Sequence, residues 1–534
     1  MRMNRFFIYF ILTGILSGCA TDNKASSTID WSDIDTTANG LMPSNLYGRP
    51  SDGYGTVVDD ANRNIAVLLP LSGVNSVVGQ TIRSSVVASV LSSAPNSLSV
   101  SFFDTGIDAI GAINSALEIN PDVIIGPVFA DNARMLRDIK PNNLPVLSFT
   151  SDVSALGDGV ISMALMPANG VEAIIHEMSS DNIKNFIIIA PDTNSGHFMA
   201  GAAKAASEYY SPELNGVFFY QESNPESIKD IAQSASMNEM RSAANTRARV
   251  VISDILTNEQ LNILEKSNLN NQLEKLSKKE TIGGVPYDAV LFLGNANDSK
   301  TLASFLRYYD IAASDARFYG TTMWDGADIA SDITMSGAKF ATLPQAKPEF
   351  YALYEQVSNM PISRLASFGY DAMNMAIGMM YSGDDMLSYL FNPSGYNGTD
   401  GLFRIKTTGE NERAVRIMQL DASGTPVEVC SAATNFITPI YNVQPDKIKP
   451  IKSLEIKTVG IDPDDYIKIP ERFRDKYNSE RIGANTRNAP MIEQSKIVAI
   501  LPDEDSESVK TENYTPIKKE QVMRSYIEEY EIFE

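Results

Sequence analysis

A run of five apolar residues, Ile65-Ala66-Val67-Leu68-Leu69, ends at Pro70, and an amphipathic stretch from residue 79 to residue 91 follows it. A strand that is buried on both faces has no polar side, so its sequence is an unbroken apolar run, whereas a half-buried strand alternates. Such a strand followed by a helix is the repeating unit of a parallel α/β sheet. These first elements therefore predict a parallel sheet that is covered by helices on both faces.

The same alternation continues along the chain and then restarts. Further apolar runs predict strands, and the stretches between them carry apolar residues at helical spacing. Because the rhythm begins again after Pro167, we expect two successive doubly wound units and hence two lobes. The predicted strands are 65–69, 99–103, 123–125, 146–149, 186–189, 217–220 and 289–293, and the predicted helices are 79–91, 109–119, 130–139, 169–178 and 197–210.

Segments of different composition flank and interrupt the lobes. Residues 20–63 are rich in Ser, Thr, Asp and Asn and are expected to form a disordered tether, with a root-mean-square span of roughly 35–40 Å. Residues 445–534 carry scattered prolines and charge clusters, and we expect a largely disordered acidic tail there. The predicted lobes are 64–166 with about 335–410 (lobe 1) and 167–334 with about 411–432 (lobe 2), and lobe 2 includes a helical insertion at about 235–280 that is either a surface arm or a partner-binding helix.

The N-terminus has the composition of a secretory signal. Two arginines precede an apolar run over residues 6–15, which is shorter than the roughly 20 residues needed to span a bilayer. The next residues, Leu16-Ser17-Gly18-Cys19, resemble the bacterial lipobox, in which the cysteine is lipidated. We therefore expect a signal peptide over residues 1–19 and a lipid anchor on Cys19, and Ala20 indicates sorting to the outer membrane. An ordinary signal peptide with an incidental cysteine is the alternative.

Composition and motifs disfavour several classes of function. The 534-residue chain has a net charge of −22 and no basic aromatic stripe, which disfavours nucleic-acid binding. It has two histidines and two cysteines, with neither HExxH nor CxxC, so we expect no metal, no cofactor and no disulfide framework. Ser336-Gly337-Ala338-Lys339 matches the SxxK pattern of serine enzymes, but no KTG follows it. We expect no enzymatic activity.

Polar residues follow the ends of several predicted strands, which is where ligands bind in doubly wound sheets. Hydroxyl groups and free backbone N–H groups at such ends can capture a small carboxylate. Alternatively, these residues simply cap the helices that follow. The candidates are Ser72 and Gly73 after the first strand, Ser148, Thr150 and Ser151 after the fourth strand, and Asp192, Thr193 and Asn194 after the first strand of the second lobe.

Several blocks of sequence resemble known proteins. Four of them are similar to branched-chain amino-acid receptors of the type I periplasmic-binding-protein fold: Pro70-Leu71-Ser72-Gly73, Asp122-Val123-Ile124-Ile125-Gly126-Pro127, Pro145-Val146-Leu147-Ser148-Phe149 and Phe368-Gly369-Tyr370-Asp371-Ala372. Three more look like the outer-membrane lipoproteins called penicillin-binding protein activators: Phe318-Tyr319-Gly320-Thr321-Thr322-Met323-Trp324-Asp325, Ser363-Arg364-Leu365-Ala366-Ser367 and Gly398-Thr399-Asp400-Gly401-Leu402-Phe403-Arg404. The resemblance covers roughly residues 64–430.

The resemblance implies a two-lobed type I periplasmic-binding-protein-like fold and a regulator that contacts a bifunctional penicillin-binding protein in the periplasm and raises its peptidoglycan synthesis. For solute receptors of this fold, it implies that the loop with Ser148, Thr150 and Ser151 holds a ligand carboxylate and that Asp325 holds its ammonium group. The aromatic residue usual after the second-lobe strand is missing, since Thr193 and Asn194 stand there. The alternative function is a lipid-anchored receptor that delivers an amino-acid-like solute to an ABC transporter.

Overall fold

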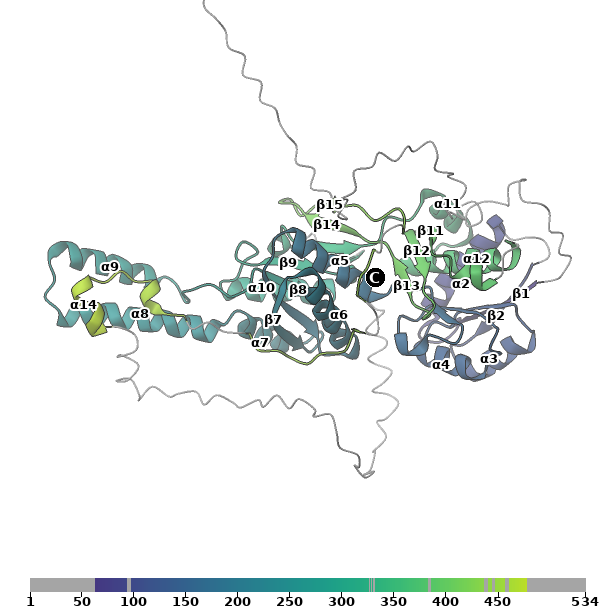
Figure 1. Ribbon diagram of the computed structural model, residues 1–534, viewed down its shortest axis with the longest axis horizontal. Helices are drawn as coiled ribbons and strands as arrows, with labels where there is room; N and C mark the ends of the chain where they lie inside the picture. Colours follow the sequence, from purple (N-terminus) through teal and green to yellow (C-terminus); the bar gives the residue numbers. More distant parts are fainter. Residues whose placement is uncertain are drawn as a thin grey trace, which may run out of the picture.

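The computed structural model describes residues 63–477, apart from residues 94–97, 326, 328, 330–331, 383–385, 437–439, 444–446 and 457–460. It has two α/β lobes side by side and a helical arm that projects from lobe 2 on the side away from lobe 1 (Figure 1). The predicted two-lobed α/β architecture is confirmed. The signal peptide, Cys19 and the tether up to residue 62 lie outside the described residues, as do residues 478–534 of the predicted tail.

Lobe 1 is built on a five-stranded parallel sheet with the strand order β2-β1-β3-β4-β5. Successive side chains of a strand point to opposite faces, and in β1 Ile65, Val67 and Leu69 join one hydrophobic core while Ala66 and Leu68 join another. This two-sided burial explains the unbroken apolar run. The strands are β1 (Arg63–Leu69), β2 (Leu98–Asp104), β3 (Val123–Ile125), β4 (Val146–Ser148) and β5 (Val160–Ser162), and the first helices are α2 (Ser76–Ser93), α3 (Ala109–Glu118) and α4 (Ala130–Ile139).

A later part of the chain returns to complete lobe 1. Two helices of this part, α11 and α12, pack on α2. A small antiparallel sheet, β11-β12-β13, lies beside β5, where the backbone N–H of Ser162 donates to the carbonyl oxygen of Gly409 at 2.8 Å. The returning elements are α11 (Pro348–Val357), α12 (Arg364–Tyr381), α13 (Met386–Leu390), β11 (Tyr396–Gly398), β12 (Gly401–Ile405) and β13 (Asn411–Arg413).

Lobe 2 is built on a seven-stranded sheet with the order β15-β14-β10-β9-β8-β6-β7. Its strands are parallel except for β14, which pairs antiparallel with both of its neighbours, β10 and β15. The strands are β6 (Asn185–Pro191), β7 (Glu213–Tyr220), β8 (Ala289–Phe292), β9 (Arg317–Gly320), β10 (Lys339–Thr342), β14 (Arg416–Leu420) and β15 (Pro426–Cys430), and the helices beside them are α5 (Pro167–Ser180), α6 (Asn194–Tyr210), α7 (Pro225–Ala235) and α10 (Ala296–Tyr308).

Three segments connect the lobes, at residues 163–166, 343–347 and 414–415. They correct two boundaries of the sequence-based domain division. Residues 335–342 were expected in lobe 1, but β10 is a strand of the lobe 2 sheet because it pairs with both β9 and β14. Residues 411–413 were expected in lobe 2, but they form β13 of the small lobe 1 sheet.

The arm consists of α8 (Asn238–Asn258), α9 (Ile263–Ser277) and α14 (Glu471–Tyr477). Its helices α8 and α9 lie within the range in which the sequence predicts a helical insertion, whereas α14 does not. At 1.5 Å per residue, α8 alone is roughly 31 Å long. The arm has a hydrophobic core of its own, in which Val251 and Ile255 of α8 meet Leu269 of α9 and Phe473 of α14. Part of this core therefore comes from the C-terminal region of the chain.

A strap, which we define as the described residues within 440–470, runs from the lobe connections to the arm. Leu454 and Val217 exchange backbone hydrogen bonds of 2.8 and 3.0 Å along the edge of β7. Nearer the arm, the backbone N–H of Lys468 donates to Gln272 Oε1 at 2.7 Å. The expectation of a largely disordered tail from residue 445 is therefore wrong for those residues between 447 and 477 that the structure describes. Its isolated apolar residues become buried only because the arm and lobe 2 provide surfaces for them.

Candidate functional site

In the serine/threonine loop after β4, the hydroxyl groups of Ser148 and Thr150 bond to the protein's own backbone. Ser148 is fully buried, and its Oγ donates to the carbonyl oxygen of Pro127 at 2.7 Å and accepts from the backbone N–H of Thr150 at 3.3 Å. Thr150 Oγ1 in turn accepts from the backbone N–H of Asp152 at 3.1 Å. Ser151 is exposed. Two of the three predicted carboxylate-binding hydroxyls therefore shape the loop.

The backbone N–H groups of the loop after β1 also bond to a group of the protein itself. The backbone N–H groups of Leu71, Ser72 and Gly106 donate to Asp104 Oδ1 at 2.8, 3.2 and 2.8 Å. Gly73 has φ +76°, a left-handed conformation that favours glycine. The backbone N–H of Ser72, predicted to capture a ligand carboxylate, thus holds a carboxylate of the protein itself.

In lobe 2, the residues after β6 cap a helix and hold the strap. Thr193 is the N-cap of α6, and its Oγ1 accepts from the backbone N–H of Gly196 at 3.0 Å. Asp192 lies 2.8 Å from Nε2 of His197, whose Nδ1 lies 2.7 Å from the carbonyl oxygen of Ile451 in the strap. Asn194 begins α6 and is exposed. For Thr193, the alternative that these polar residues cap the following helix is therefore correct.

Asp325, the predicted partner for a ligand ammonium group, is paired with a cation of its own chain. Its Oδ2 accepts from Arg364 Nε at 2.8 Å, and this contact joins the end of the lobe 2 sheet to the start of α12 in lobe 1. Arg364 Nη1 also donates to Asp400 Oδ1 at 2.9 Å and to the carbonyl oxygen of Pro344 at 2.7 Å. Burial alone would lower the pKa of Arg364, but the charges of Asp400 and Asp325 raise it above its ordinary value.

Another arginine, which is fully buried, lies close to another of the lobe connections. Arg413 is 1% exposed, and its Nη2 donates to the carbonyl oxygen of Met163 at 2.9 Å. Its guanidinium stacks on Phe368 and lies 3.7 Å from Asp371. Burial raises the pKa of Asp371 to about 6, against the opposing effects of Arg413 and Thr399. We call Arg364 and Arg413 the hinge arginines, because each binds a backbone carbonyl of a segment that connects the lobes.

The sequence interpretation did not assign a role to either hinge arginine. A signal was nevertheless present, because Asp371 lies within the apolar helix sequence that surrounds it, and a fully buried carboxylate needs a partner. Arg364, Asp371 and Asp400 also lie within the sequence blocks that carry the family resemblance. Arg364 pairs with Asp400, and Arg413 lies beside Asp371, so these blocks come together near the lobe connections.

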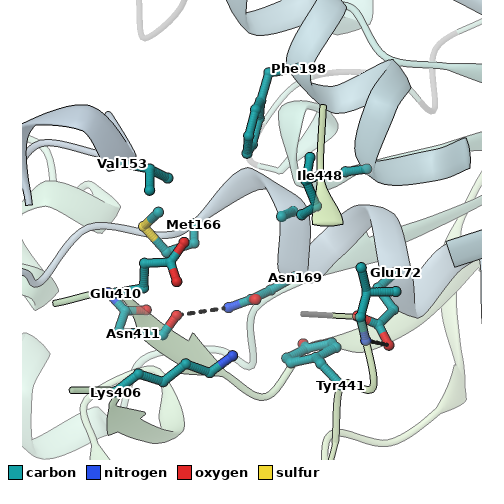
Figure 2. Close-up of a pocket in the computed structure, with 13 residues that line it drawn as sticks. Val153, Met166, Asn169, Glu172, Phe198, Lys406, Glu410, Asn411, Tyr441 and Ile448 are labelled. Atoms are coloured by element: carbon teal, nitrogen blue, oxygen red, sulfur yellow. Dashed lines mark hydrogen bonds between the residues drawn. The ribbon is translucent and has the colours of Figure 1, made fainter. Parts of the chain in front are cut away.

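A small cavity lies between the lobes and the strap (Figure 2). Lobe 1 lines it with Lys406 and Glu410, lobe 2 with Asn169 and Phe198, and the strap with Tyr441. Its volume is about 30 Å³, which is enough for one or two water molecules. Pockets for small ligands are about ten times larger or more, at roughly 300–1,000 Å³. In this conformation the cavity has no room for an amino acid.

A buried carboxylate holds the strap at the wall of this cavity. Glu172 of α5 accepts backbone N–H groups from Asn442 at 2.5 Å and Val443 at 3.2 Å, and the hydroxyl of Tyr210 at 3.0 Å. Burial raises the pKa of Glu172, although these hydrogen bonds oppose the shift. Tyr441 donates from its hydroxyl to the carbonyl oxygen of Arg413 at 2.6 Å. The strap is therefore bonded to lobe 2 and to the small sheet of lobe 1 at once.

The SxxK pattern has no catalytic geometry. Lys339 Nζ forms ion pairs with Glu177 at 2.6 Å and Asp181 at 2.8 Å. Burial lowers the pKa of Lys339, but these two carboxylates raise it overall, which is the wrong direction for a general base. Ser336 Oγ donates instead to the carbonyl oxygen of Asp421 at 3.3 Å. In the described part of the chain, no cluster of His, Cys, Asp and Glu has the arrangement of a metal site.

A family model described as "LppC putative lipoprotein" matches residues 57–379, which is more than half of the chain. The chain belongs to the LppC lipoprotein family. Two curated relatives are both named "Penicillin-binding protein activator LpoA". The protein of Mannheimia succiniciproducens is 30% identical over 143 residues, which are 26% of this chain and 24% of that one. The protein of Pasteurella multocida is 23% identical over 200 residues, 35% and 34% of the two chains. This LppC-family chain thus spans about a quarter to a third of the curated relatives it matches.

Solved structures resemble this LppC-family chain in fold. A "putative branched-chain amino acid ABC transporter" from Rhodospirillum rubrum has a TM-score of 0.51 at 15% identity, over 69% of this chain and 100% of that one. The C-domain of LpoA from Haemophilus influenzae, described as a regulator of PBP1A, has a TM-score of 0.45 at 16% identity, over 68% and 99% of the two chains. The first of these similarities supports the type I periplasmic-binding-protein-like fold.

Proposed function

We propose that this chain is an outer-membrane lipoprotein that faces the periplasm and regulates peptidoglycan synthesis by binding a bifunctional penicillin-binding protein. The observation that carries the proposal is membership of the LppC family together with curated relatives that are named activators of penicillin-binding proteins. Because the match spans only part of those relatives, the activity and the partner are carried over as a proposal.

The geometry between the lobes supports a protein-binding role over solute capture. Asp325 is neutralised by Arg364, and the hydroxyl groups of Ser148 and Thr150 bond to the protein's own backbone. The interlobe cavity of about 30 Å³ is too small for an amino acid. The groups that a solute receptor of this fold would present to its ligand therefore stabilise the protein itself.

The N-terminal sequence supports the proposed location. A lipidated Cys19 followed by a tether of about 40 residues would let the folded body reach a partner roughly 35–40 Å from the membrane. Among the described residues, no helix has the length and apolar character to cross a bilayer. A Cys19→Ala variant is expected to leave the outer-membrane fraction, and wild-type-like fractionation of this variant would contradict the anchor.

The function is tested with the full lipoprotein in detergent and a purified bifunctional penicillin-binding protein from the same envelope. We expect a complex in pull-down and a faster rate of glycan polymerisation or cross-linking by the synthase. If the protein neither binds the synthase nor changes its rate, the proposal is wrong. A panel of amino acids separates the alternative, because a ligand at 100-fold its Kd stabilises a receptor by about 2.7 kcal/mol, whereas we expect no thermal shift.

A further inference from the structure

Two neighbouring loops of lobe 1, together with the first turns of the helices that follow them, expose four large aliphatic side chains. Val74 and Val77 lie after β1 and are 73% and 65% exposed, while Ile107 and Ile110 lie after β2 and are 85% and 56% exposed. β1 and β2 are adjacent strands, and β2 is the edge strand furthest from β5 and the lobe connections. We call these four residues the lip. They follow the carboxyl ends of β1 and β2, on the side of the sheet that is furthest from the lobe connections.

The loops of the lip are held in one conformation. Asp104 accepts three backbone N–H groups that come from both loops. A Cβ on Gly106 would lie 2.1 Å from the carbonyl oxygen of Ser72, so the two loops are in direct backbone contact. Asp108 caps α3 by accepting from the backbone N–H of Gly111 at 2.9 Å. A preformed surface of this kind loses little conformational entropy when a partner binds.

The lip residues make no contribution to the hydrophobic core that would explain them. On α2, Ile82 and Val86 face the core and are fully buried, whereas Val77 on the same helix is exposed. On α3, Ile113 is fully buried and Ile110 is exposed. Single exposed aliphatic residues are common on protein surfaces, but a contiguous group of them marks an interaction site.

The charge around the lip indicates the chemistry of its partner. Asp104 and Asp108 lie between and beside the four aliphatic residues. Burial alone would raise the pKa of Asp104, but the hydrogen bonds from Ser72, Gly106 and Leu71 lower it overall. This carboxylate therefore stays ionised at neutral pH. The chain as a whole carries a net charge of −22. A complementary surface would therefore have apolar side chains flanked by lysine or arginine.

We propose that the lip is the docking surface for a protein partner whose contact patch is apolar and flanked by basic residues. This inference rests on the proposed function, in which the partner is a penicillin-binding protein, and it adds the surface and the chemistry of the contact. The four aliphatic residues supply the centre of the interface, and the two aspartates supply its charged edge.

The tip of the arm also exposes aliphatic residues, and its charges distinguish it from the lip. Ile263 and Leu264 are 91% and 70% exposed. The carboxylate beside them, Glu265, forms an ion pair with Arg472 of α14, so the tip offers no carboxylate like those of the lip to attract a basic partner. The arm tip is therefore a comparison site in the experiment.

The experiment measures the Kd of the full lipoprotein in detergent for the purified bifunctional penicillin-binding protein. Ile107→Asp and Val77→Asp are expected to weaken binding by tenfold or more without changing the melting temperature, because both side chains are exposed. Leu91→Asp is the matched control, since it lies at the other end of α2 and is 72% exposed. This control and Leu264→Asp at the arm tip are expected to bind within twofold of the wild type.

Charge is tested with a second substitution at one position. Because the partner is proposed to be basic, Ile107→Lys should weaken binding more than Ile107→Asp does, and binding of the wild type should weaken as salt rises. Equal or reversed effects of the two substitutions would overturn the basic character of the partner. If the wild type binds and the Ile107 and Val77 variants bind equally well, or if only Leu264→Asp weakens binding, the lip is not the docking surface. If the wild type does not bind at all, the proposed function itself fails.

Discussion

Replacement of Arg364 by alanine would remove the cation that joins the two lobes. In the folded protein this guanidinium bonds Asp325 of lobe 2, Asp400 of lobe 1 and the carbonyl oxygen of Pro344. The Asp400 side chain is fully buried, and its second oxygen accepts from Ser367 Oγ at 2.5 Å. After the substitution, Asp400 would remain buried without its ion-pair partner.

The expected magnitude follows from the burial of these groups. Removing one partner of a buried ion pair destabilises a protein by about 3–5 kcal/mol. The side chains of Arg364 and Asp325 are 25% and 19% exposed, so their own contact contributes less, and Asp400 dominates the loss. Unfolding entropy of about 2.1 cal/mol/K per residue gives roughly 0.8 kcal/mol/K for a body of roughly 400 residues, so we expect the Tm to fall by about 4–6 °C.

The assay is calorimetric melting of Arg364→Ala beside a matched control, Arg134→Ala. Arg134 also forms two ion pairs, but its partners Asp131 and Asp152 are 75% and 41% exposed. Exposed pairs contribute about 0–1 kcal/mol, so the control should shift the Tm by about 1 °C or less. Equal shifts for the two variants, or an Arg364→Ala protein as stable as the wild type, would refute the assignment of a buried lobe-joining ion pair.

Three further outcomes test the buried network and the strap. Burial raises the pKa of Asp371 to about 6, so the folded state holds this proton more tightly than the unfolded chain does. The free energy of unfolding should therefore fall as pH rises from about 4 to about 6. In denaturant titrations, Asp371→Asn should remove this part of the pH dependence. Tyr441→Phe leaves a buried carbonyl oxygen without its donor and should lower the free energy of unfolding by about 1–3 kcal/mol. Gly201→Ala places a Cβ 2.0 Å from the carbonyl oxygen of Lys449, so protease cleavage of the strap should become faster, whereas Gly284→Ala, with open space around its Cβ, should have no effect.

Each of these expectations has a contradicting result. An unchanged pH dependence in Asp371→Asn would show that another group titrates in this window. Wild-type stability of Tyr441→Phe would mean that the strap contributes little to the folded state. Because alanine is favoured over glycine by about 1 kcal/mol in a helix, a Gly201→Ala protein with a more protease-resistant strap would show that the strap does not lie on α6.

Local patterns explain why the lobes could be predicted. The side chains of β1 alternate between two hydrophobic cores, so burial on both faces appears in the sequence as an unbroken apolar run. On α2 and α3, the buried residues recur at helical spacing. The strand β10 was missed because its short sequence Lys339-Phe340-Ala341-Thr342 carries two polar residues, and only pairing with its neighbours makes it a strand.

The candidate site could be predicted only in part, because its chemistry depends on contacts between distant residues. The sequence locates Ser148 and Thr150 at the end of a strand, but it does not reveal that their hydroxyl groups bond to the protein's own backbone. It indicates Asp325 as an acid near the sheet edge, but not that Arg364, from a different lobe, lies 2.8 Å away. The sequence predicted Ser148, Thr150 and Asp325 as polar groups of the site, but it did not predict the groups that bond to them.

The sequence by itself determined the two α/β lobes and the family resemblance, because both depend on patterns within short windows of the chain. Only the tertiary structure decided how Asp325 is neutralised, how the strap is ordered and which aliphatic residues of lobe 1 remain exposed. The physical reason is that burial of an isolated apolar residue, or pairing of a charge, depends on surfaces that distant segments supply. Ile451 of the strap illustrates this: its carbonyl oxygen is held by His197, which is 254 positions earlier in the chain.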